Sequence, residues 1–325
     1  MTARTRLDEA LDRLRDGPLV SRTRFDEPLG PLTTYRVGGA AAALVTVENE
    51  GDLDALGSLI AATGVVVVPL GRGSNLLVAD AGFAGLAVLL GGGFAAIGVD
   101  GTTVTAGAAA KLPVVARTTV QQGLTGFEWA VGVPGSVGGA VRMNAGGHGA
   151  EMRDSLSAAD VLDLRTGSRR WWTPDELDFG YRRSAITATD LVLAARLELS
   201  PGDRDAGRAE LAEIVQWRRE NQPGGQNAGS VFTNPEGDSA GRLIEAAGAK
   251  GLRIGTAEVS AKHANFIQAD EGGRAADVLS VMTEVRRRVE EKCGVTLHPE
   301  THLLGFGDPE DPFANPFDPP PEDRP

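Results

Sequence analysis

The most informative segment of the chain runs Gly132-Val-Pro-Gly-Ser-Val-Gly-Gly-Ala-Val-Arg-Met-Asn-Ala-Gly-Gly147. Six of its sixteen residues are glycine, and Pro134 fixes a turn just before Gly135 and Ser136. Because glycine has no side chain, backbone N–H groups in such a segment can closely approach a flat or anionic ligand. The segment therefore predicts one wall of a large-cofactor site. A glycine-rich turn with close helix packing is the alternative.

A second glycine-rich loop, Gly71-Arg-Gly-Ser-Asn75, lies between two apolar runs. It is neither a Walker loop, since no Gly-Lys-Ser/Thr follows, nor a Gly-x-Gly-x-x-Gly motif, since Leu76 takes the last glycine position. N–H groups around Gly73 and Ser74 can form an anion-binding concavity, with Asn75 tolerating a positive φ. A tight turn explains this loop alone equally well, but the two loops together predict a dinucleotide pyrophosphate held from two sides.

Two polar segments further along supply groups suited to an anionic substrate. Tyr181-Arg-Arg-Ser184 offers guanidinium forks for a carboxylate or phosphate, with an exposed arginine pair as the alternative. The segment 227–235 presents Ser230 directly after a glycine, without the Gly-x-Ser-x-Gly elbow or the paired base of a serine nucleophile. Ser230 is therefore better suited to donate a hydrogen bond or a proton, and a helix-capping serine is the alternative.

Two more polar groups lie in the last third of the chain. Lys262, His263 and Asn265 stand beside an apolar anchor, so this segment predicts a polar wall for a phosphate-bearing substrate. Glu300 follows a strand-like run at 295–297. Taken alone, Glu300 is typical of a solvated carboxylate.

Composition and length exclude several classes of function. The 325 residues predict about two domains, and 42% apolar with 5% aromatic residues is usual for a soluble chain of helices and strands. A net charge of −12 argues against a nucleic-acid or anionic-membrane partner. No apolar run approaches the ~20 residues of a membrane helix, and the N-terminus lacks the apolar centre of a signal peptide. We expect a cytoplasmic monomer.

Cysteine and histidine indicate no metal or redox site. Cys293 is the only cysteine, which excludes an internal disulfide and a Cys-x-x-Cys pair. The four histidines, at 148, 263, 298 and 302, have no metal-ligand spacing. We therefore expect no bound metal.

Predicted strands and helices alternate over the first 200 residues. After an amphipathic N-terminal helix, short apolar runs at 65–70, 76–79 and 86–90 predict buried strands. Asp52 is expected to cap a helix with one apolar face, and another helix is expected over 113–123, opened by proline and ended by glycine.

The best internal boundary is Ser-Pro-Gly-Asp-Arg-Asp-Ala-Gly at 200–207. Alternating apolar residues predict a strand over 191–199 before it. Helical spacing follows around Leu211, around Leu243 and in a long helix that ends at Gly294. From residue 308 the chain carries seven prolines and six acidic residues, so we expect a disordered tail.

Taken together and in this order, these segments resemble the UDP-N-acetylenolpyruvoylglucosamine reductases, flavoenzymes of bacterial cell-wall synthesis. The resemblance runs from about Leu32 to Gly305 and rests on nine motifs in register, each weak alone. These motifs are Thr33–Gly39, Gly71–Asn75, Gly126–Gly146, Tyr181-Arg182 with Ser184, Arg218–Pro223, Asn227–Pro235, Ala240–Glu245, Lys262–Ile267 and Pro299-Glu300.

The resemblance implies an α+β fold with a two-subdomain FAD-binding region of the vanillyl-alcohol-oxidase (PCMH) type and a smaller α+β substrate-binding domain. It places an N-terminal helix at 1–18, the FAD-binding region at 19–202, the substrate domain at 203–305 and the tail at 306–325. It also implies FAD as cofactor, NADPH as hydride donor and UDP-N-acetylglucosamine enolpyruvate as substrate. The direct passage from Ser184 into the 191–199 strand is similar to the shorter subtype, which lacks an inserted tyrosine loop.

The resemblance also implies roles for single residues. Arg182 would stabilise the negative charge that builds towards the substrate carboxylate, Ser230 would deliver a proton to the ether-bearing carbon, and protonated Glu300 would donate a hydrogen bond. The residues expected near the substrate are Tyr181, Asn234, Lys262 and Asn265. The residues expected at the cofactor are Gly71, Gly73, Ser74, Asn75, Gly132, Pro134, Gly135, Ser136, Gly139, Ala140, Asn144 and Gly146.

Some positions depart from the family pattern. Thr233 stands where many relatives have lysine, and Gly147-His148 replaces a more usual Ala-Tyr. Two other functions stay open: an FAD oxidase of the same superfamily acting on an alcohol or sugar lactone, and a non-catalytic flavin- or sugar-nucleotide-binding protein. Binding alone would not require an acid and an anion stabiliser at one carbon.

Overall fold

The structure is a computed structural model that describes residues 2–307 and 311–317. The chain forms two compact units, each assembled from separate stretches of sequence. The first unit comprises residues 1–24, 43–72 and 86–220, and the second comprises 25–42, 73–85 and 221–325. The chain therefore passes between the units several times, three of them within the strands β1 (Thr23–Pro28), β2 (Ala40–Val47) and β5 (Phe83–Leu90).

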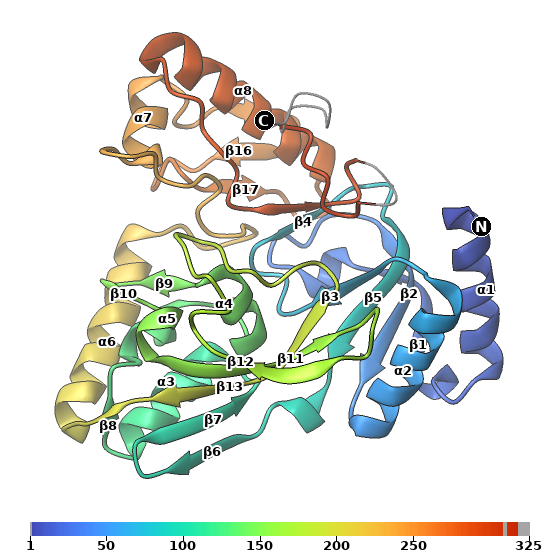
Figure 1. Ribbon diagram of the computed structural model, residues 1–325. Helices are drawn as coiled ribbons and strands as arrows, with labels where there is room; N and C mark the ends of the chain where they lie inside the picture. The colour runs from blue at the N-terminus through green and yellow to red at the C-terminus, as the bar shows by residue number, and fades with distance from the viewer. Residues whose placement is uncertain (1, 308–310, 318–325) are drawn as a thin grey trace. The chain divides into compact units, whose positions relative to one another are not determined.

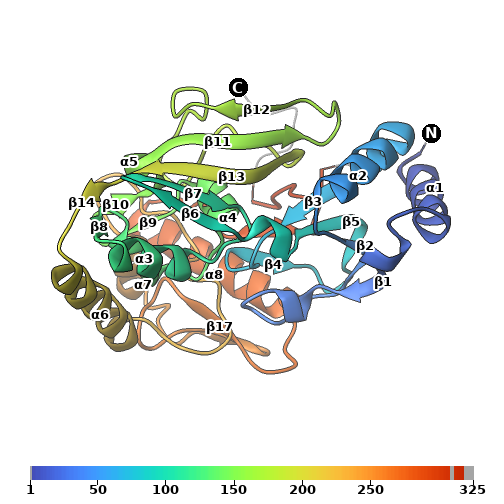
Figure 2. The same ribbon diagram turned by 90° about the horizontal axis from the view of Figure 1, so that it is seen from below.

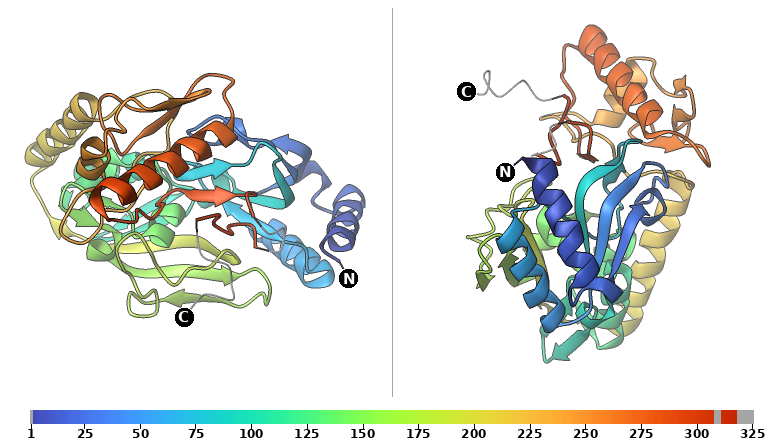
Figure 3. Two further views of the ribbon diagram at one scale, coloured as in Figure 1. Left: turned by 90° about the horizontal axis from the view of Figure 1, so that it is seen from above. Right: turned by 90° about the vertical axis from the view of Figure 1, so that its right-hand side faces the viewer.

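The first third of the chain forms two helices and a small sheet. α1 (Ala3–Asp16) and α2 (Glu50–Thr63) lie side by side (Figure 3). The sheet has the order β1-β2-β5-β3, formed by Thr23–Pro28, Ala40–Val47, Phe83–Leu90 and Val67–Leu70. β3 and β5 are parallel and almost wholly apolar, as expected for strands covered on both faces.

The start of α2 corrects one expectation from the sequence. Asn49, not Asp52, is the N-cap, and its side chain accepts the Asp52 N–H at 3.0 Å. Asp52 lies in the first turn, where its negative charge suits the helix dipole, and its carboxylate accepts the Glu48 N–H at 2.9 Å. The apolar face is buried as predicted, through Leu53, Leu56, Leu59 and Ile60.

A five-stranded antiparallel sheet forms the rest of the first unit, in the order β12-β11-β13-β7-β6. Its strands are Arg169–Trp172, Leu156–Asp163, Asp190–Glu198, Thr103–Gly107 and Ile97–Asp100. The helices α3 (Leu112–Gln121) and α4 (Val137–Met143) lie along one face (Figure 2). One apolar core, with Val115, Val141 and Ala195 fully buried, joins the sheet to these helices.

Shorter elements complete the first unit. The two-stranded pairs are β9 (Gly146–Gly147) with β10 (Ala150–Glu151) and β8 (Leu124–Thr125) with β14 (Ser200–Pro201). The remaining helices are α5 (Met152–Ser155), α6 (Arg204–Asn221) and the 3₁₀ turns η1 (Val20–Arg22), η3 (Gly92–Phe94) and η4 (Glu128–Gly132). α6 thus belongs to the first unit, up to residue 220. The functional domain boundary near 202 stays a prediction, because compactness alone does not say which ligand a segment binds.

The second unit has its own apolar core. Its elements are η2 (Gly30–Leu32), the parallel pair β4 (Leu76–Val78) and β18 (His302–Leu304), the antiparallel strands β15 (Arg253–Ile254), β16 (Ala257–Val259) and β17 (Ile267–Ala269), and the helices α7 (Ala240–Ala246) and α8 (Ala275–Cys293). α8 packs against the three-stranded sheet and α7 (Figure 1). Val281, Val285 and Val289 of α8 are fully buried in this core.

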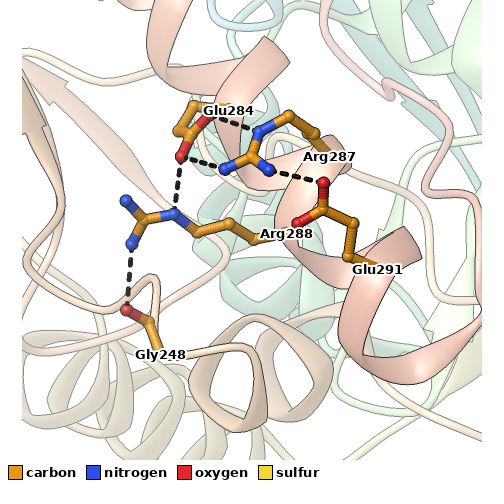
Figure 4. Close-up of polar contacts among 5 residues, drawn as sticks. All are labelled: Gly248, Glu284, Arg287, Arg288 and Glu291. Atoms are coloured by element: carbon orange, nitrogen blue, oxygen red, sulfur yellow. Dashed lines mark hydrogen bonds and ion pairs between the residues drawn. The ribbon is translucent and has the colours of Figure 1, made fainter.

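The outer face of α8 carries a network of charges (Figure 4). The Glu284 carboxylate accepts hydrogen bonds from Arg287 and Arg288, which lower its pKa to about 2. The other end of Arg288 donates to the Gly248 carbonyl at 3.3 Å, just beyond α7. Such exposed pairs add little stability individually. Their contribution here is to join α8 to the end of α7.

The predicted helices and the strands β3, β4, β5 and β13 are confirmed, including the end of α8 at Gly294 in a left-handed conformation. α3 begins at Leu112, with the predicted Pro113 as its second residue, and ends at Gln121. The strand-like run at 295–297 does not form a strand in the structure. Residues 308–310 and 318–325 of the predicted disordered tail lie outside the described residues. Within the described part of that tail, Phe313 stacks edge-on against His302 at 5.5 Å, and Arg286 lies 4.5 Å over the Phe317 ring.

Candidate active site

The glycine-rich segment of the first unit is a fixed loop rather than a loose connection. It starts in η4, continues through α4 and ends in β9. Residues 108–112 hold it by three backbone hydrogen bonds: Gly135 accepts from Leu112 at 3.1 Å, Val137 donates to Ala110 at 2.9 Å, and Gly138 donates to Ala108 at 3.0 Å. The N–H groups of positions 137 and 138 therefore fix the loop instead of facing a ligand.

Two of the predicted cofactor residues approach each other closely in this unit. A Cβ atom at Gly71 would lie 2.9 Å from the Ser136 hydroxyl, which is tighter than ordinary packing. The Ser136 hydroxyl also lies 3.5 Å from the Gly139 N–H, as the N-cap of α4. Gly71 and Gly139 are exposed while Ser136 is buried. The structure thus brings the start of the first predicted loop against the middle of the second, with bare backbone at the surface.

Other predicted cofactor residues in the first unit have packing roles. A Cβ atom at Gly132 would lie 3.1 Å from Ile214 and 3.2 Å from Arg218, so glycine there lets α6 pack closely. Gly146 is equally crowded, because a Cβ would lie 2.6 Å from the Ala150 carbonyl. Ala140 is buried inside α4, and Pro134 is exposed. Their assignment to the cofactor stays a prediction.

Asn144 ends α4 in a left-handed conformation, with φ 40°. Its side chain is fully buried and bonded at both ends, since the amide donates to the Gly180 carbonyl at 3.0 Å and the oxygen accepts the Arg153 N–H at 3.0 Å. Asparagine tolerates this backbone conformation better than most residues. Asn144 therefore links the end of the glycine-rich segment to the turn that carries Arg182.

Arg182 lies in a tight turn, with paired hydrogen bonds between Gly180 and Arg183 at its base. Its guanidinium donates to the Gly146 carbonyl at 3.0 Å and to the Asn144 carbonyl at 3.5 Å. The exposed ring of Tyr181 lies 5.0 Å from the same guanidinium. Since a guanidinium has five N–H donors, these carbonyls orient it while it can still bind an anion. The structure thus places Arg182 directly on the predicted cofactor segment.

Ser184 belongs to the Tyr181–Ser184 segment, but its sequence pattern predicts no role for it. In the structure the Ser184 hydroxyl donates to the Arg142 carbonyl in α4 at 2.7 Å. This bond anchors the outgoing side of the Arg182 turn, and only five residues then separate Ser184 from β13. A serine next to an arginine pair is too common a pattern to have indicated this anchor.

Ser230 lies in a loop of the second unit that is held from two sides. On one side, the next residue, Val231, donates to the Asn265 carbonyl at 2.9 Å. On the other side, the Val231 carbonyl accepts the N–H of Glu300 at 2.8 Å. The structure therefore places the Ser230 and Glu300 segments side by side. Within residues 2–307 and 311–317, the half-buried Ser230 hydroxyl has no hydrogen-bond partner.

The first predicted cofactor loop also reaches the Glu300 segment within the second unit. The Asn75 amide donates to the Glu300 carbonyl at 3.0 Å, and the Asn75 carbonyl accepts the His302 N–H at 3.1 Å. Gly73, with φ 59°, is needed where the loop turns, because a Cβ there would lie 2.5 Å from the Leu32 carbonyl. Ser74 is half-buried beside it.

The predicted substrate residues of the second unit occupy three different environments. Asn265 is almost completely buried, and its side chain bonds the main chain of Phe232. Asn234 is exposed, and its oxygen accepts the Ala240 N–H at 3.0 Å at the start of α7. Lys262 is exposed. Thr233, the residue that stands where many relatives have lysine, donates a hydrogen bond from its hydroxyl to the His298 carbonyl at 3.2 Å.

His148, the second residue that departs from the family pattern, lies in the first unit with a positive φ of 55°. Its ring stacks edge-on against Trp217 of α6 at 5.2 Å, and burial followed by the nearby Arg218 charge lowers its pKa. The structure thus places this histidine against α6, beside Gly132. Periodicity could not have shown this contact, because the two residues are 69 positions apart.

The described residues also bear on metals and membranes. In residues 2–307 and 311–317, no group of three or more His, Cys, Asp or Glu side chains is arranged to hold a metal ion. In the same residues, no helix combines the length and the apolar character needed to cross a bilayer.

Comparison with protein families gives two matches that together span most of the chain. Residues 221–304 match the family described as UDP-N-acetylenolpyruvoylglucosamine reductase, C-terminal domain. Residues 41–172 match the family described as FAD binding domain.

Individual relatives agree with these matches along nearly their whole length. The UDP-N-acetylenolpyruvoylglucosamine reductase of Paramagnetospirillum magneticum is 46% identical, over 88% of this chain and 92% of the relative. The protein of that name from Rubrobacter xylanophilus is 42% identical, over 88% and 97%. The crystal structure of the UDP-N-acetylenolpyruvylglucosamine reductase of Thermus caldophilus has a TM-score of 0.75 at 37% identity, over 86% and 97%. These likenesses confirm the predicted α+β fold with its PCMH-type FAD-binding region.

Proposed function

The chain belongs to the UDP-N-acetylenolpyruvoylglucosamine reductase family, and from this we propose that it is an FAD-dependent oxidoreductase of peptidoglycan precursor synthesis. Its substrate is UDP-N-acetylglucosamine enolpyruvate, its hydride donor is NADPH, and its product is UDP-N-acetylmuramate. The comparisons give no support to an alcohol or lactone oxidase, or to a non-catalytic binding protein. The monomeric state and the domain boundaries stay predictions.

The residues present fit FAD. The two glycine-containing loops of the first unit meet at Gly71 and Ser136 with no room for a Cβ atom, and both Gly71 and Gly139 are exposed. Bare backbone of this kind suits a pyrophosphate, whose oxygens accept hydrogen bonds from N–H groups. Gly71, Ser136 and Gly139 are therefore the residues we expect to hold the dinucleotide, with Gly73, Ser74 and Asn75 continuing the first loop.

Bound FAD would supply the redox chemistry of the reaction, which is the transfer of a hydride from NADPH to the methylene carbon of the enolpyruvyl group. Addition of hydride breaks the carbon–carbon double bond and moves an electron pair towards the adjacent carbon and its carboxylate. Arg182 stabilises this developing anion, since its guanidinium is charged throughout the physiological pH range and is already oriented by two carbonyls. Orientation before the reaction matters because no reorganisation is then required as charge develops.

Ser230 supplies the proton that completes the reduction at the ether-bearing carbon. A serine hydroxyl is a weak acid towards water but strong enough to protonate a carbanion. Glu300, in its protonated form, donates a hydrogen bond to the developing charge. The main-chain hydrogen bond between Glu300 and Val231 supports this pairing of roles, because it holds the Ser230 and Glu300 segments next to each other.

The observation that carries the proposal is the hydrogen bond that joins Glu300 to Val231, the residue after Ser230, in a chain that matches its relatives almost end to end. The test uses Ser230→Ala in holoenzyme, with flavin absorbance followed in each half-reaction separately. Loss of a general acid typically costs about 10²–10⁴ in rate. Reduction by NADPH should continue, while reoxidation by the enolpyruvyl substrate should slow by that factor. Equal impairment of both half-reactions would contradict the role of Ser230.

A further inference from the structure

The Asn265 side chain acts as a clamp on the loop that carries Ser230. Its oxygen accepts the Phe232 N–H at 3.0 Å, and its amide donates to the Phe232 carbonyl at 2.8 Å. Its own main-chain carbonyl accepts the Val231 N–H at 2.9 Å. Asn265 is only 4% exposed. Three hydrogen bonds thus hold the two residues that follow Ser230.

Asn75 makes the matching contact on the Glu300 side. Its amide donates to the Glu300 carbonyl, and its main-chain carbonyl accepts the His302 N–H. Glu300 in turn donates its N–H to Val231, inside the segment that Asn265 holds. One continuous set of hydrogen bonds therefore runs from Asn265 through the Ser230 loop and the Glu300 segment to Asn75.

We propose that Asn265 and Asn75 are positioning residues, which hold Ser230 and Glu300 at a fixed separation, rather than residues that bind substrate and cofactor through their side chains. The proposal rests on the proposed function, because it concerns the proton donor and hydrogen-bond donor of that reaction. It replaces the roles that family resemblance implied for these two side chains.

Burial and chemistry both favour this assignment. The oxygen and the amide nitrogen of the Asn265 side chain both form hydrogen bonds with the main chain of Phe232, as a neighbouring β-strand would. Because a buried polar group that loses its hydrogen-bond partner is destabilised, the clamp is energetically significant. A substrate contact, by contrast, would require an accessible carboxamide.

The test is Asn265→Asp, studied by reoxidation of NADPH-reduced holoenzyme with UDP-N-acetylglucosamine enolpyruvate. A carboxylate can accept the Phe232 N–H, but it repels the Phe232 carbonyl until it is protonated. At pH 8 we expect the saturated reoxidation rate to fall about ten- to hundredfold, as for a misplaced catalytic group. The half-saturating substrate concentration should stay within about twofold of the wild type, because substrate contacts are unchanged.

The pH profile separates positioning from a general loss of structure. Burial raises the pKa of a carboxyl group, so the protonated acid, which can donate to the Phe232 carbonyl, gains population as the pH falls. The variant's rate relative to wild type should therefore rise between pH 8 and pH 6. Asn49→Asp is the matched control, since the α2 cap only accepts a hydrogen bond and a carboxylate does so equally well.

Three results would overturn the proposal. An increase in half-saturating concentration at an unchanged saturated rate would show that Asn265 touches substrate. A loss of rate without recovery at low pH would show a merely structural role, as would equal slowing of reduction by NADPH. If Asn265→Asp does not fold, Asn75→Asp tests the same donor loss at a half-buried position. Failure of the wild type to reoxidise would instead reject the proposed function itself.

Discussion

The two units hold their proposed catalytic groups in opposite ways. In the first unit, the Arg182 side chain itself is held, because its guanidinium donates to the carbonyls of Asn144 and Gly146. In the second unit, the main chain around Ser230 and Glu300 is held, and the hydroxyl of Ser230 has no partner within the described residues. A charged side chain that must face an anion has to be held in one orientation. For a proton donor it is enough that the main chain that carries it is held in place.

The largest effect on the rate should come from Arg182, whose side chain is itself held by hydrogen bonds. Arg182→Lys retains the charge but cannot span two carbonyls and an anion, so flavin reoxidation by the enolpyruvyl substrate should slow about 10²–10³-fold. Stopped-flow absorbance measures the rate. Arg183→Lys is the matched control, since the exposed Arg183 side chain forms an ion pair with the exposed Asp178, which lysine can also form. A rate near wild type for Arg182→Lys would break the comparison.

The unit that relies on its main chain should be most sensitive to backbone changes. Gly73→Ala forces a Cβ to within 2.5 Å of the Leu32 carbonyl at a positive φ of 59°. We expect a loss of about 2 kcal/mol or more in the free energy of unfolding, measured by urea denaturation. Gly57→Ala, in the middle of α2 with open space around it, is the control and should gain about 0.5–1 kcal/mol. Equal effects would show that the turn at Gly73 is not strained.

A smaller effect is expected from Asn144, the asparagine of the first unit that forms a hydrogen bond with the turn that carries Arg182. Asn144→Gly retains the left-handed end of α4 but removes the bonds to Gly180 and Arg153. The Arg182 turn should then shift, and reoxidation should slow about tenfold, as expected from about 1.4 kcal/mol. Asp178→Gly makes the same backbone change at another left-handed residue, in an exposed pair with Arg183, and should leave the rate unchanged. Equal rates in both variants would show that Asn144 does not position Arg182.

The smallest effect concerns pH. Burial is the main cause that lowers the pKa of His263 in the second unit and of His148 in the first. As the pH falls, these histidines are protonated in the unfolded chain before they are protonated in the folded one. Their contribution to the free energy of unfolding is therefore fully present above about pH 6.5 and is lost as the pH falls below that value. The half-buried His263 should contribute more than the exposed His148, because its Nδ1 accepts the Asn265 N–H at 3.2 Å.

Thermal unfolding between pH 7.5 and 5.5 checks this. His263→Gln should flatten the loss of stability with acid, and His148→Gln should flatten it less. A steeper loss with acid in His263→Gln than in the wild type would show that the sign is reversed. Identical slopes in the two variants would show that burial does not distinguish these histidines.

Local patterns predicted most of the elements because their causes are local. Apolar alternation identified β13, helical spacing identified α8, and a glycine marked the end of that helix. The cap of α2 was predicted at the wrong residue, since both Asn49 and Asp52 have suitable side chains and only the backbone conformation distinguishes them. Patterns of this kind depend on neighbours within one or two turns.

The candidate site was predicted only as a set of separate segments. Arg182, Ser230 and Glu300 were chosen through a family resemblance, since each residue alone has an ordinary alternative interpretation. Nothing local indicates that Asn75 bonds a residue 225 positions away, or that Asn265 spans 33 positions to clamp Phe232. Carboxamides look alike in sequence whether they face a ligand or a main chain.

The sequence by itself determined which family the chain joins, and it predicted that the glycine-rich segment lines a cofactor site. These properties follow from residue types and their order. Tertiary structure alone decided that part of the glycine-rich segment is bonded inward to residues 108–112, and that three asparagines hold the catalytic segments. The physical reason is that each hydrogen bond needs two partners at a set distance, and folding, not sequence spacing, sets that distance.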